Sequence, residues 1–324
     1  MNVRPTASRF IVVIVLALLV VSAGALIAAR EGSLYRLTDR ARMAMRHVNR
    51  NLHYTLGWQL PGTPDLGALD ARLKEKNLTR GDAVFMRVFK NELELELWMQ
   101  RGDRFVLFAT YPICYWSGGL GPKVRQGDKQ APEGFYAISR GQLNPNSRWF
   151  RAFNVGFPNV LDQAYGRTGS YLMVHGGCSS IGCYAMTNPV IGEIWELVTA
   201  ALDKGQGSIG LHIFPFRLTQ ARLNAYDGHA WATFWRDMKP GYDLFETTNI
   251  PPQIRVCQKR YMAEAGAPGS KTSVPHNACP PGNTSSTRAG SLQMEAPQFD
   301  GCSRLFAGHA ISKENRISRS GIAL

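Results

Sequence analysis

Acidic residues are scarce in this chain, and several common sequence features are missing. The 24 Asp and Glu residues are outnumbered by 37 Lys and Arg, which gives a formal net charge of +13. Such a charge favours polyanionic partners. The basic residues are scattered, however, and no nucleic-acid-binding module is visible, so we expect no nucleic-acid partner. The chain has no internal repeat, and we expect it to need neither a cofactor nor a metal.

One long apolar run lies at the N-terminus. Residues Phe10 to Ala29 carry no charge, and they follow Arg4 and Arg9 and precede Arg30. This pattern indicates an export signal. Twenty apolar residues also suffice to span a bilayer, so the run is either cleaved, with small residues at 22–25 as the cleavage site, or retained as a membrane anchor. No cysteine follows the run directly, which argues against lipoprotein processing.

A series of arginines follows the apolar run. Its members are Arg36, Arg40, Arg42, Arg46 and Arg50. They form either the solvated face of a helix or a surface that contacts lipid headgroups. For an exported protein, the other polyanions within reach are anionic polymers of the cell wall.

A histidine and a cysteine lie close together between residues 175 and 186, which read His-Gly-Gly-Cys-Ser-Ser-Ile-Gly-Cys-Tyr-Ala-Met. A thiol attacks a carbonyl only as the thiolate, and a neighbouring imidazole can accept its proton. Cys183 and His175 are therefore predicted to be a nucleophile and its general base, as acyl transfer through a thioester requires. Ser180 either orients His175 or caps the turn.

Glycines at 176, 177 and 182 allow backbone conformations that a side chain would forbid. They also let main-chain N–H groups approach a substrate carbonyl closely. We expect the N–H groups of Gly182 and Cys183 to form an oxyanion hole, with Gly176 as a supporting residue.

A helix is predicted shortly after the cysteine. Asn188 is its expected N-cap, Pro189 its first helical residue and Gly205 its stop. Cys183 would then lie on a tight turn just before a helix, which exposes a nucleophile.

Residues 180–186 resemble the Ser-His-Gly-Cys-x-Arg-Met signature of the YkuD-type L,D-transpeptidases, and His175-Gly176 matches the His-Gly that precedes it. Residues 127–135 resemble the family's Gly-Asp-x-x-Thr-Pro-x-Gly-x-Phe hairpin, and residues 157–159 its Phe-Pro-Asn segment. The short spacing from histidine to cysteine, together with residues 212–217 and 241–246, is closer to the YafK branch. The resemblance covers residues 80–260.

The resemblance implies a fold and an activity. Cys183 would attack the carbonyl on the L-centre of meso-diaminopimelate in a peptidoglycan stem peptide, in the periplasm. An amine as second substrate would give transpeptidation. Water would give L,D-endopeptidase activity, which includes release of a wall-anchored lipoprotein. Peptidoglycan stem peptides, such a lipoprotein and, if the apolar run is retained, the inner membrane are the implied partners.

Two positions depart from the family signature. Ile181 replaces its second histidine, and Ala185 replaces the arginine that follows the cysteine. A guanidinium binds a carboxylate through two parallel hydrogen bonds. Its absence leaves the recognition of the substrate carboxylate without an assigned residue.

The expected fold class is α+β overall, with a mostly β catalytic domain of the YkuD-like sandwich or barrel type and helical additions. Two sets of side chains alternate over residues 84–89, and leucine alternates with glutamate over residues 92–97, so strands are expected there; strands are also expected at 104–110, 134–138, 171–174 and 209–216. We expect His212, on the last of these, to be a buried core residue, with a role in orienting the site as the alternative. Trp231, Phe234 and Trp235 are expected to be core rather than a sugar-stacking platform.

The expected organisation has five parts. Residues 1–31 are the signal peptide or anchor, 32–80 a helical lead segment, 81–217 the catalytic domain, 218–265 an appendage of helices and strands, and 266–324 a Pro-, Gly- and Ser-rich tail that lacks structure. The lead segment should hold two helices separated by the prolines at 61 and 64.

Six cysteines in an exported chain permit disulfides. If Cys183 stays free, five remain, so no complete pairing follows from the count; pairs among Cys257, Cys279 and Cys302 are open. Cys178 either pairs with another thiol or is a small buried apolar residue.

Two other functions compete with a thiol enzyme. One is a zinc-binding module using His175, Cys178 and Cys183, although structural zinc sites usually need four ligands. The other is a non-catalytic wall-binding protein that retains the scaffold.

Overall fold

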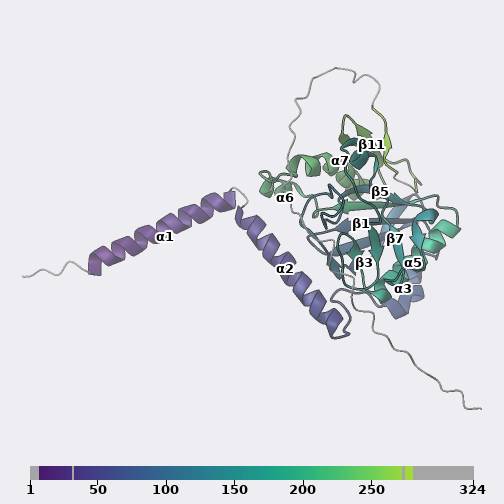
Figure 1. The fold of residues 1–324 in the computed structure, drawn as a ribbon, viewed down its shortest axis with the longest axis horizontal. Coiled ribbons are helices and arrows are strands. Elements are labelled where there is room, and N and C mark those ends of the chain that lie inside the picture. The colour runs from purple at the N-terminus through teal and green to yellow at the C-terminus, as the bar shows by residue number, and fades with distance from the viewer. Residues whose placement is uncertain (1–6, 31–32, 272–273, 280–324) are drawn as a thin grey trace, which may run out of the picture. The chain divides into compact units, whose positions relative to one another are not determined.

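The computed structural model describes residues 7–30, 33–271 and 274–279, and within them the chain has the expected α+β organisation (Figure 1). The described helices are α1 (Ala7–Arg30), α2 (Ser33–Thr55), α3 (Leu69–Glu75), α4 (Val160–Ala164), α5 (Asn188–Asp203), α6 (Gln220–Ala225) and α7 (Ala232–Thr248), with short 3₁₀ turns at Leu66–Ala68 and Arg140–Gln142. Within this described part of the chain, none of the helices combines the length and hydropathy that a membrane crossing requires.

Three sheets carry the strands. The first sheet has the order β3 (Arg104–Pro112), β2 (Glu94–Arg101), β1 (Val84–Phe89), β10 (Ile209–Phe214) and β5 (Gly134–Ile138). The second has the order β4 (Tyr115–Trp116), β9 (Tyr184–Ala185), β8 (Met173–His175), β7 (Ala152–Asn154) and β6 (Leu143–Asn144). The third has the order β12 (Arg260–Glu264), β11 (Gln253–Cys257) and β13 (His276–Asn277).

Both faces of the first sheet are buried, because the two sets of alternating residues on β1 meet different layers. Val84, Met86 and Val88 pack into the main core with α5 and with residues of the second sheet. Phe85 and Phe89 point the other way and pack against residues of α7. Figure 1 accordingly shows α5 and α7 on opposite sides of the strands.

The predicted appendage, residues 218–265, shares its core with the first sheet. Trp235 and Tyr242 of α7 belong to the same hydrophobic cluster as Phe89 and Phe214. Trp235 is fully buried, and Trp231 and Phe234 pack partly buried against this cluster, so the aromatic group is core as expected. His212 is fully buried on β10, where the rings of Phe85 and Phe135 meet its imidazole edge-on. It lies in the first sheet and has no place in the catalytic site.

A structured segment occupies the beginning of the predicted tail, which corrects its expected start at residue 266. β13 pairs in parallel with β11, and a disulfide joins Cys279 to Cys257. This pair was among those that the sequence left open. The rest of the expected tail, with Cys302, lies outside the described residues.

α2 is bound to the catalytic domain through part of the arginine series. Arg46 donates to the carbonyl of Asn91 at 2.9 Å, and Arg50 donates to the carbonyl of Ile113 at 2.7 Å. Asp39 is buried and pairs with Arg222 at 2.6 Å. Arg50 is thus buried, neither solvated nor facing lipid, which corrects both expectations for this residue. Arg46 binds the domain while its side chain stays exposed.

The loop between β4 and β5 is held by a fully buried ion pair. Lys90 Nζ lies 3.0 Å from Glu133 Oε1, and both side chains have no exposed surface. Lys90 also donates to the carbonyls of Gly119, Gly121 and Ala131 at 2.8–3.0 Å. Burial lowers the pKa of Lys90, and the carboxylate of Glu133 opposes that shift.

Breaking this pair is expected to destabilise the protein strongly. Lys90→Met leaves a buried carboxylate without its counter-charge, so the free energy of unfolding should fall by about 3–5 kcal/mol. Denaturant titration of the purified protein measures it. The double variant Lys90→Met/Glu133→Gln removes both charges and should recover part of the loss; a double variant that is less stable than Lys90→Met would contradict this account.

Candidate active site

Two short parallel strands bring the predicted nucleophile and base near one another in the second sheet. His175 at the end of β8 pairs with Ala185 on β9. Cys183 lies in the turn directly before β9, which begins at Tyr184. Because Val174 pairs with Tyr184, this turn lies beside β8, and the N–H of Met173 on β8 contacts the sulfur of Cys183.

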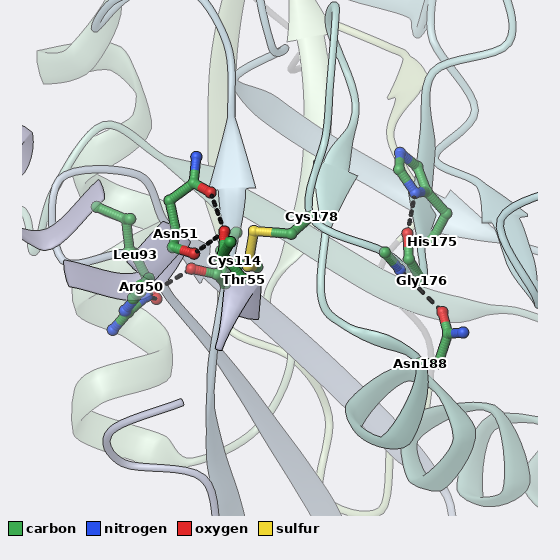
Figure 2. Close-up of a disulfide and its surroundings, with 11 residues drawn as sticks. Arg50, Asn51, Thr55, Leu93, Cys114, His175, Gly176, Cys178 and Asn188 are labelled. Carbon is green, nitrogen blue, oxygen red and sulfur yellow. Dashed lines mark hydrogen bonds between the residues drawn. A yellow bond between two sulfur atoms is a disulfide. The ribbon is translucent and has the colours of Figure 1, made fainter. Parts of the chain in front are cut away.

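The imidazole of His175 is oriented by the next peptide group. Its Nδ1 lies 2.6 Å from the carbonyl oxygen of Gly176 (Figure 2). Because a carbonyl can only accept, Nδ1 must carry the proton, and Nε2 is left with a lone pair. The ring of Trp149 stacks on the imidazole at 5.7 Å between centroids and an interplanar angle of 29°. Nε2 can therefore act as a base.

Burial determines the charge of this histidine. Desolvation lowers the pKa of His175, and the positive charge of Arg148 lowers it further, while the bond to Gly176 raises it. The imidazole is therefore neutral at physiological pH. A neutral imidazole is the form that can accept a proton from a thiol.

Cys183 is the free cysteine of the described residues, and two main-chain groups contact its sulfur. The N–H of Met173 points at Sγ at 3.4 Å, and the carbonyl of Tyr171 lies 3.9 Å away. Burial raises the pKa of the Cys183 thiol, while the N–H of Met173 and the charge of Lys123 lower it. The resting pair is thus a neutral thiol and a neutral imidazole, and the thiolate must form during the reaction.

Ser180 caps the turn before Cys183. Its hydroxyl accepts from the N–H groups of Gly182 at 3.1 Å and Cys183 at 2.7 Å, and it donates to the carbonyl of Cys183 at 2.7 Å. This favours the capping role over the orientation of His175. Both predicted oxyanion-hole donors point at Ser180 Oγ, so the oxyanion hole stays a prediction that requires them to exchange this acceptor for the substrate.

The helix after the cysteine begins differently from the prediction. α5 starts at Asn188 with Thr187 as its N-cap, and β9 lies between Cys183 and this helix. Asn188 is therefore not the N-cap; its side-chain oxygen instead accepts from the N–H of Gly177 at 2.9 Å. Figure 2 shows Asn188 beside the His175–Gly176 turn. A Cβ on Gly176 would lie only 2.4 Å from that oxygen, so the close approach requires glycine.

A disulfide fixes the other side of the same loop. Cys178 is bonded to Cys114, with 5.3 Å between the Cα atoms (Figure 2). Cys178 is thus paired rather than a free apolar residue. A disulfide sulfur is not a thiolate ligand, so the zinc module loses one of its three proposed ligands. Among the described residues, moreover, no group of three or more His, Cys, Asp or Glu side chains could hold a metal ion.

Two cations act on the site. Lys123 is buried and paired with Asp128. Arg148 is exposed, stacks at 6.0 Å over the ring of Trp149, and pairs with no carboxylate of the described residues. Ala185, which stands where the family signature has arginine, is fully buried. Of these positions, Arg148 offers a guanidinium that is accessible to a substrate carboxylate.

The site also contains residues that sequence reasoning missed. Trp149 stacks on the base, and Tyr171 presents its carbonyl to the thiol from a left-handed conformation, with φ of 53°. Neither lies in a recognisable motif. The tryptophan could have been suspected only from the Arg-Trp-Phe sequence at 148–150.

The conformation of Gly182 generates a prediction. Its φ of +136° disfavours any side chain, and a Cβ there would lie 3.2 Å from Leu172. Gly182→Val should cost about 1–3 kcal/mol of stability through backbone strain. By displacing the N–H groups of residue 182 and Cys183 from the position where they would bind the oxyanion, it should also abolish acylation of Cys183 by a carbapenem, a reagent that acylates the thiol in this family, measured by intact mass. Gly228→Val, at a position with open space and no left-handed φ, is the control; acylation of Gly182→Val at the unsubstituted rate would contradict the prediction.

Known proteins similar to this chain indicate its family. No protein-family model matches the chain. Two curated relatives, both named "Putative L,D-transpeptidase YafK" and found in Escherichia coli strains K12 and O157:H7, are 49% identical to it over 187 residues, which are 58% of this chain and 76% of each relative. Among solved structures, the helical cell shape determining protein Pgp2 of Campylobacter jejuni is 20% identical, with a TM-score of 0.34 over 54% of this chain and 67% of that one. Bd1075 of Bdellovibrio bacteriovorus is 18% identical, with a TM-score of 0.31 over 50% of this chain and 60% of that one. These structural likenesses are too weak to support an argument, but the identity and coverage of the YafK relatives suffice: the chain belongs to the L,D-transpeptidase family.

Proposed function

We propose that this chain is an exported enzyme of peptidoglycan metabolism that transfers the acyl group of meso-diaminopimelate through a thioester on Cys183. The observation that carries the proposal is the hydrogen bond from His175 Nδ1 to the carbonyl of Gly176, which leaves Nε2 as a base on the strand beside the turn that bears Cys183. The substrate class comes from the family and from the name of the YafK relatives.

The proposed first half-reaction begins with proton transfer. His175 Nε2 takes the thiol proton while the sulfur attacks the amide carbonyl, and a tetrahedral intermediate forms. The C–N bond then breaks, and the protonated imidazole gives its proton to the leaving amine. The product is a thioester on Cys183.

Stabilising the tetrahedral oxyanion requires a local rearrangement. The N–H groups of Gly182 and Cys183 are bonded to Ser180 Oγ. If the Ser180 hydroxyl turns away, both N–H groups become available at the carbon that the sulfur attacks. An oxyanion-hole donor lowers a barrier by about 2.7–4 kcal/mol, so the exchange of one acceptor for another is favourable in the transition state.

The second half-reaction decides the physiological role. An amine that attacks the thioester yields a new amide, which is transpeptidation, whereas water yields a free acid, which is endopeptidase activity. Either reaction regenerates the thiol. The resemblance to the YafK branch favours hydrolysis, including release of a wall-anchored lipoprotein.

Defined muropeptides test the proposed activity. The purified protein should convert them to crosslinked or hydrolysed products that mass spectrometry resolves. Cys183→Ala and His175→Gln should lose turnover, because the first lacks the nucleophile and the second lacks the base. His276→Gln removes an exposed histidine elsewhere and should retain full activity. Turnover by Cys183→Ala at the unsubstituted rate would rule out the thioester route.

The pH dependence of acylation separates a neutral pair from a preformed ion pair. The pKa of His175 lies below its usual 6.5 and that of Cys183 above its usual 9.0, both because of burial. Since the base must be neutral, the acylation rate should fall only as the pH drops through the lowered His175 pKa, so the acidic limb lies below pH 6.5. No alkaline limb should occur below pH 9.0, because the imidazole is already neutral there and ionisation of the thiol does not hinder attack.

Stopped-flow measurements of the rate of carbapenem acylation at a series of pH values would provide the pH–rate profile. A preformed ion pair would instead give a bell-shaped profile, whose alkaline limb reports loss of the imidazolium proton. A bell centred near neutrality would therefore overturn the neutral-pair assignment while leaving the nucleophile in place.

A further inference from the structure

α2 has two faces of opposite character, and the polar one is turned inward. The side chains that contact the catalytic domain include Asp39, Arg46, His47 and Arg50, all close to one line along the helix. Since a helix turns 100° per residue, the residues at 37, 41, 45, 48 and 52 lie on the opposite line. These five, Leu37, Ala41, Met45, Val48 and Leu52, are called the outer stripe.

The outer stripe is apolar and exposed. The exposed fractions are 62% for Leu37, 70% for Met45, 70% for Val48 and 53% for Leu52. Ala41 is exposed as well. A continuous apolar line on a helix whose other face is already bound to its own domain marks an interaction surface.

Cations flank this stripe, and no exposed carboxylate accompanies them. Arg40 and Arg42 are both exposed, and they lie about 100° to either side of Ala41. The one acidic residue of α2, Asp39, is buried against Arg222. An apolar line between two arginines is the pattern of a helix that lies in a membrane interface and attracts anionic lipids.

We propose that the outer stripe of α2 lies on the surface of a bilayer containing anionic phospholipid. The sequence just before α2 favours this occupant, because only three residues separate the uncharged apolar run of Phe10 to Ala29 from Ser33. A second copy of the chain is a poorer occupant. It would bring Arg40 and Arg42 of one helix against those of another, with no carboxylate on either exposed face.

The contact has a consequence for the catalytic domain. α2 binds the domain on one side and lipid on the other, so the domain rests on the bilayer through this helix. The hydrogen bonds from Arg46 and Arg50 to main-chain carbonyls keep the helix fixed to the domain.

Photolabelling from within the bilayer tests the proposal on the full chain. The probe is phosphatidylglycerol that carries a diazirine in its acyl chain, mixed into phosphatidylcholine vesicles. After irradiation, peptide mass mapping should find label on the outer stripe of α2 and none on α7. Labelling confined to residues 10–29, with none on α2, would overturn the proposal.

Matched variants identify what the contact depends on. Val48→Glu/Leu52→Glu places two carboxylates in the stripe and should lose the α2 label. Val274→Glu, which changes an exposed apolar residue outside α2, should keep it. Arg40→Gln/Arg42→Gln leaves the stripe intact and should lower α2 labelling severalfold; labelling unchanged in both double variants would contradict lipid contact through this face.

Two further readouts separate the alternatives. Crosslinks between two copies of α2 would assign the stripe to self-association and overturn the proposal. So would protection of Met45 from oxidation that rises with protein concentration in the absence of vesicles. Turnover of soluble muropeptides should be the same in Val48→Glu/Leu52→Glu as in the unsubstituted protein. This result distinguishes loss of lipid contact from loss of the catalytic function proposed above.

Discussion

The loop of residues 176–183 connects two parallel strands, β8 and β9, and is unusually short for such a connection. β8 and β9 lie side by side in parallel, yet only residues 176–183 connect them. Parallel neighbours usually need a dozen or more connecting residues, most often with a helix. The short connection explains the left-handed conformations of Gly177 and Gly182, and it explains why bonds from Asn188, Ser180 and the Cys114 disulfide hold the loop at three points. The site depends on this constraint, because it sets the register that brings the turn of Cys183 beside the strand of His175.

Burial, rather than an opposite charge, sets the protonation state of the catalytic pair. Desolvation lowers the pKa of the imidazole and raises that of the thiol, so both effects favour the uncharged forms. The cations Lys123 and Arg148 partly oppose this for the thiol and reinforce it for the imidazole. A site of this kind keeps its thiol protonated until a substrate arrives. In an oxidising compartment this protects the sulfur, since thiolate character governs its reactivity toward oxidants.

Much of the fold could be predicted from local patterns. The alternation over residues 84–89 and 92–97 predicted β1 and β2, and the helical period after Pro189 predicted α5, because period and burial coincide in those segments. Cys183 and His175 were predicted from a short motif. The long-range contacts could not be found in this way. The partner of Cys178 lies 64 residues away, and Trp149 approaches His175 only because β7 and β8 pair.

The partners of several groups near the site could not be read from the sequence. The roles of Asn188 and of the N–H groups of Gly182 and Cys183 were predicted from local rules for helix starts and nucleophile turns, which assume that these groups have no other partner. In the folded chain each has one: Gly177 for Asn188, and Ser180 for the two N–H groups. Sequence patterns show which hydrogen-bonding groups are present, but the tight crossover between β8 and β9 decides which of them meet.

The arginines after the apolar run show the same limit at the scale of a helix. Their spacing suggested one solvated or lipid-facing surface, whereas the structure divides them. Arg46 and Arg50 bind main-chain carbonyls of the domain, and Arg40 and Arg42 remain exposed beside the apolar outer stripe. The division follows from which side of the helix meets the carbonyls of Asn91 and Ile113. Because arginine can donate to those carbonyls and an apolar side chain cannot, Arg46 and Arg50 lie on the side that faces the domain and the apolar line lies on the other side. An apolar line in that position then requires a second apolar environment, and a bilayer beside the preceding run would supply it.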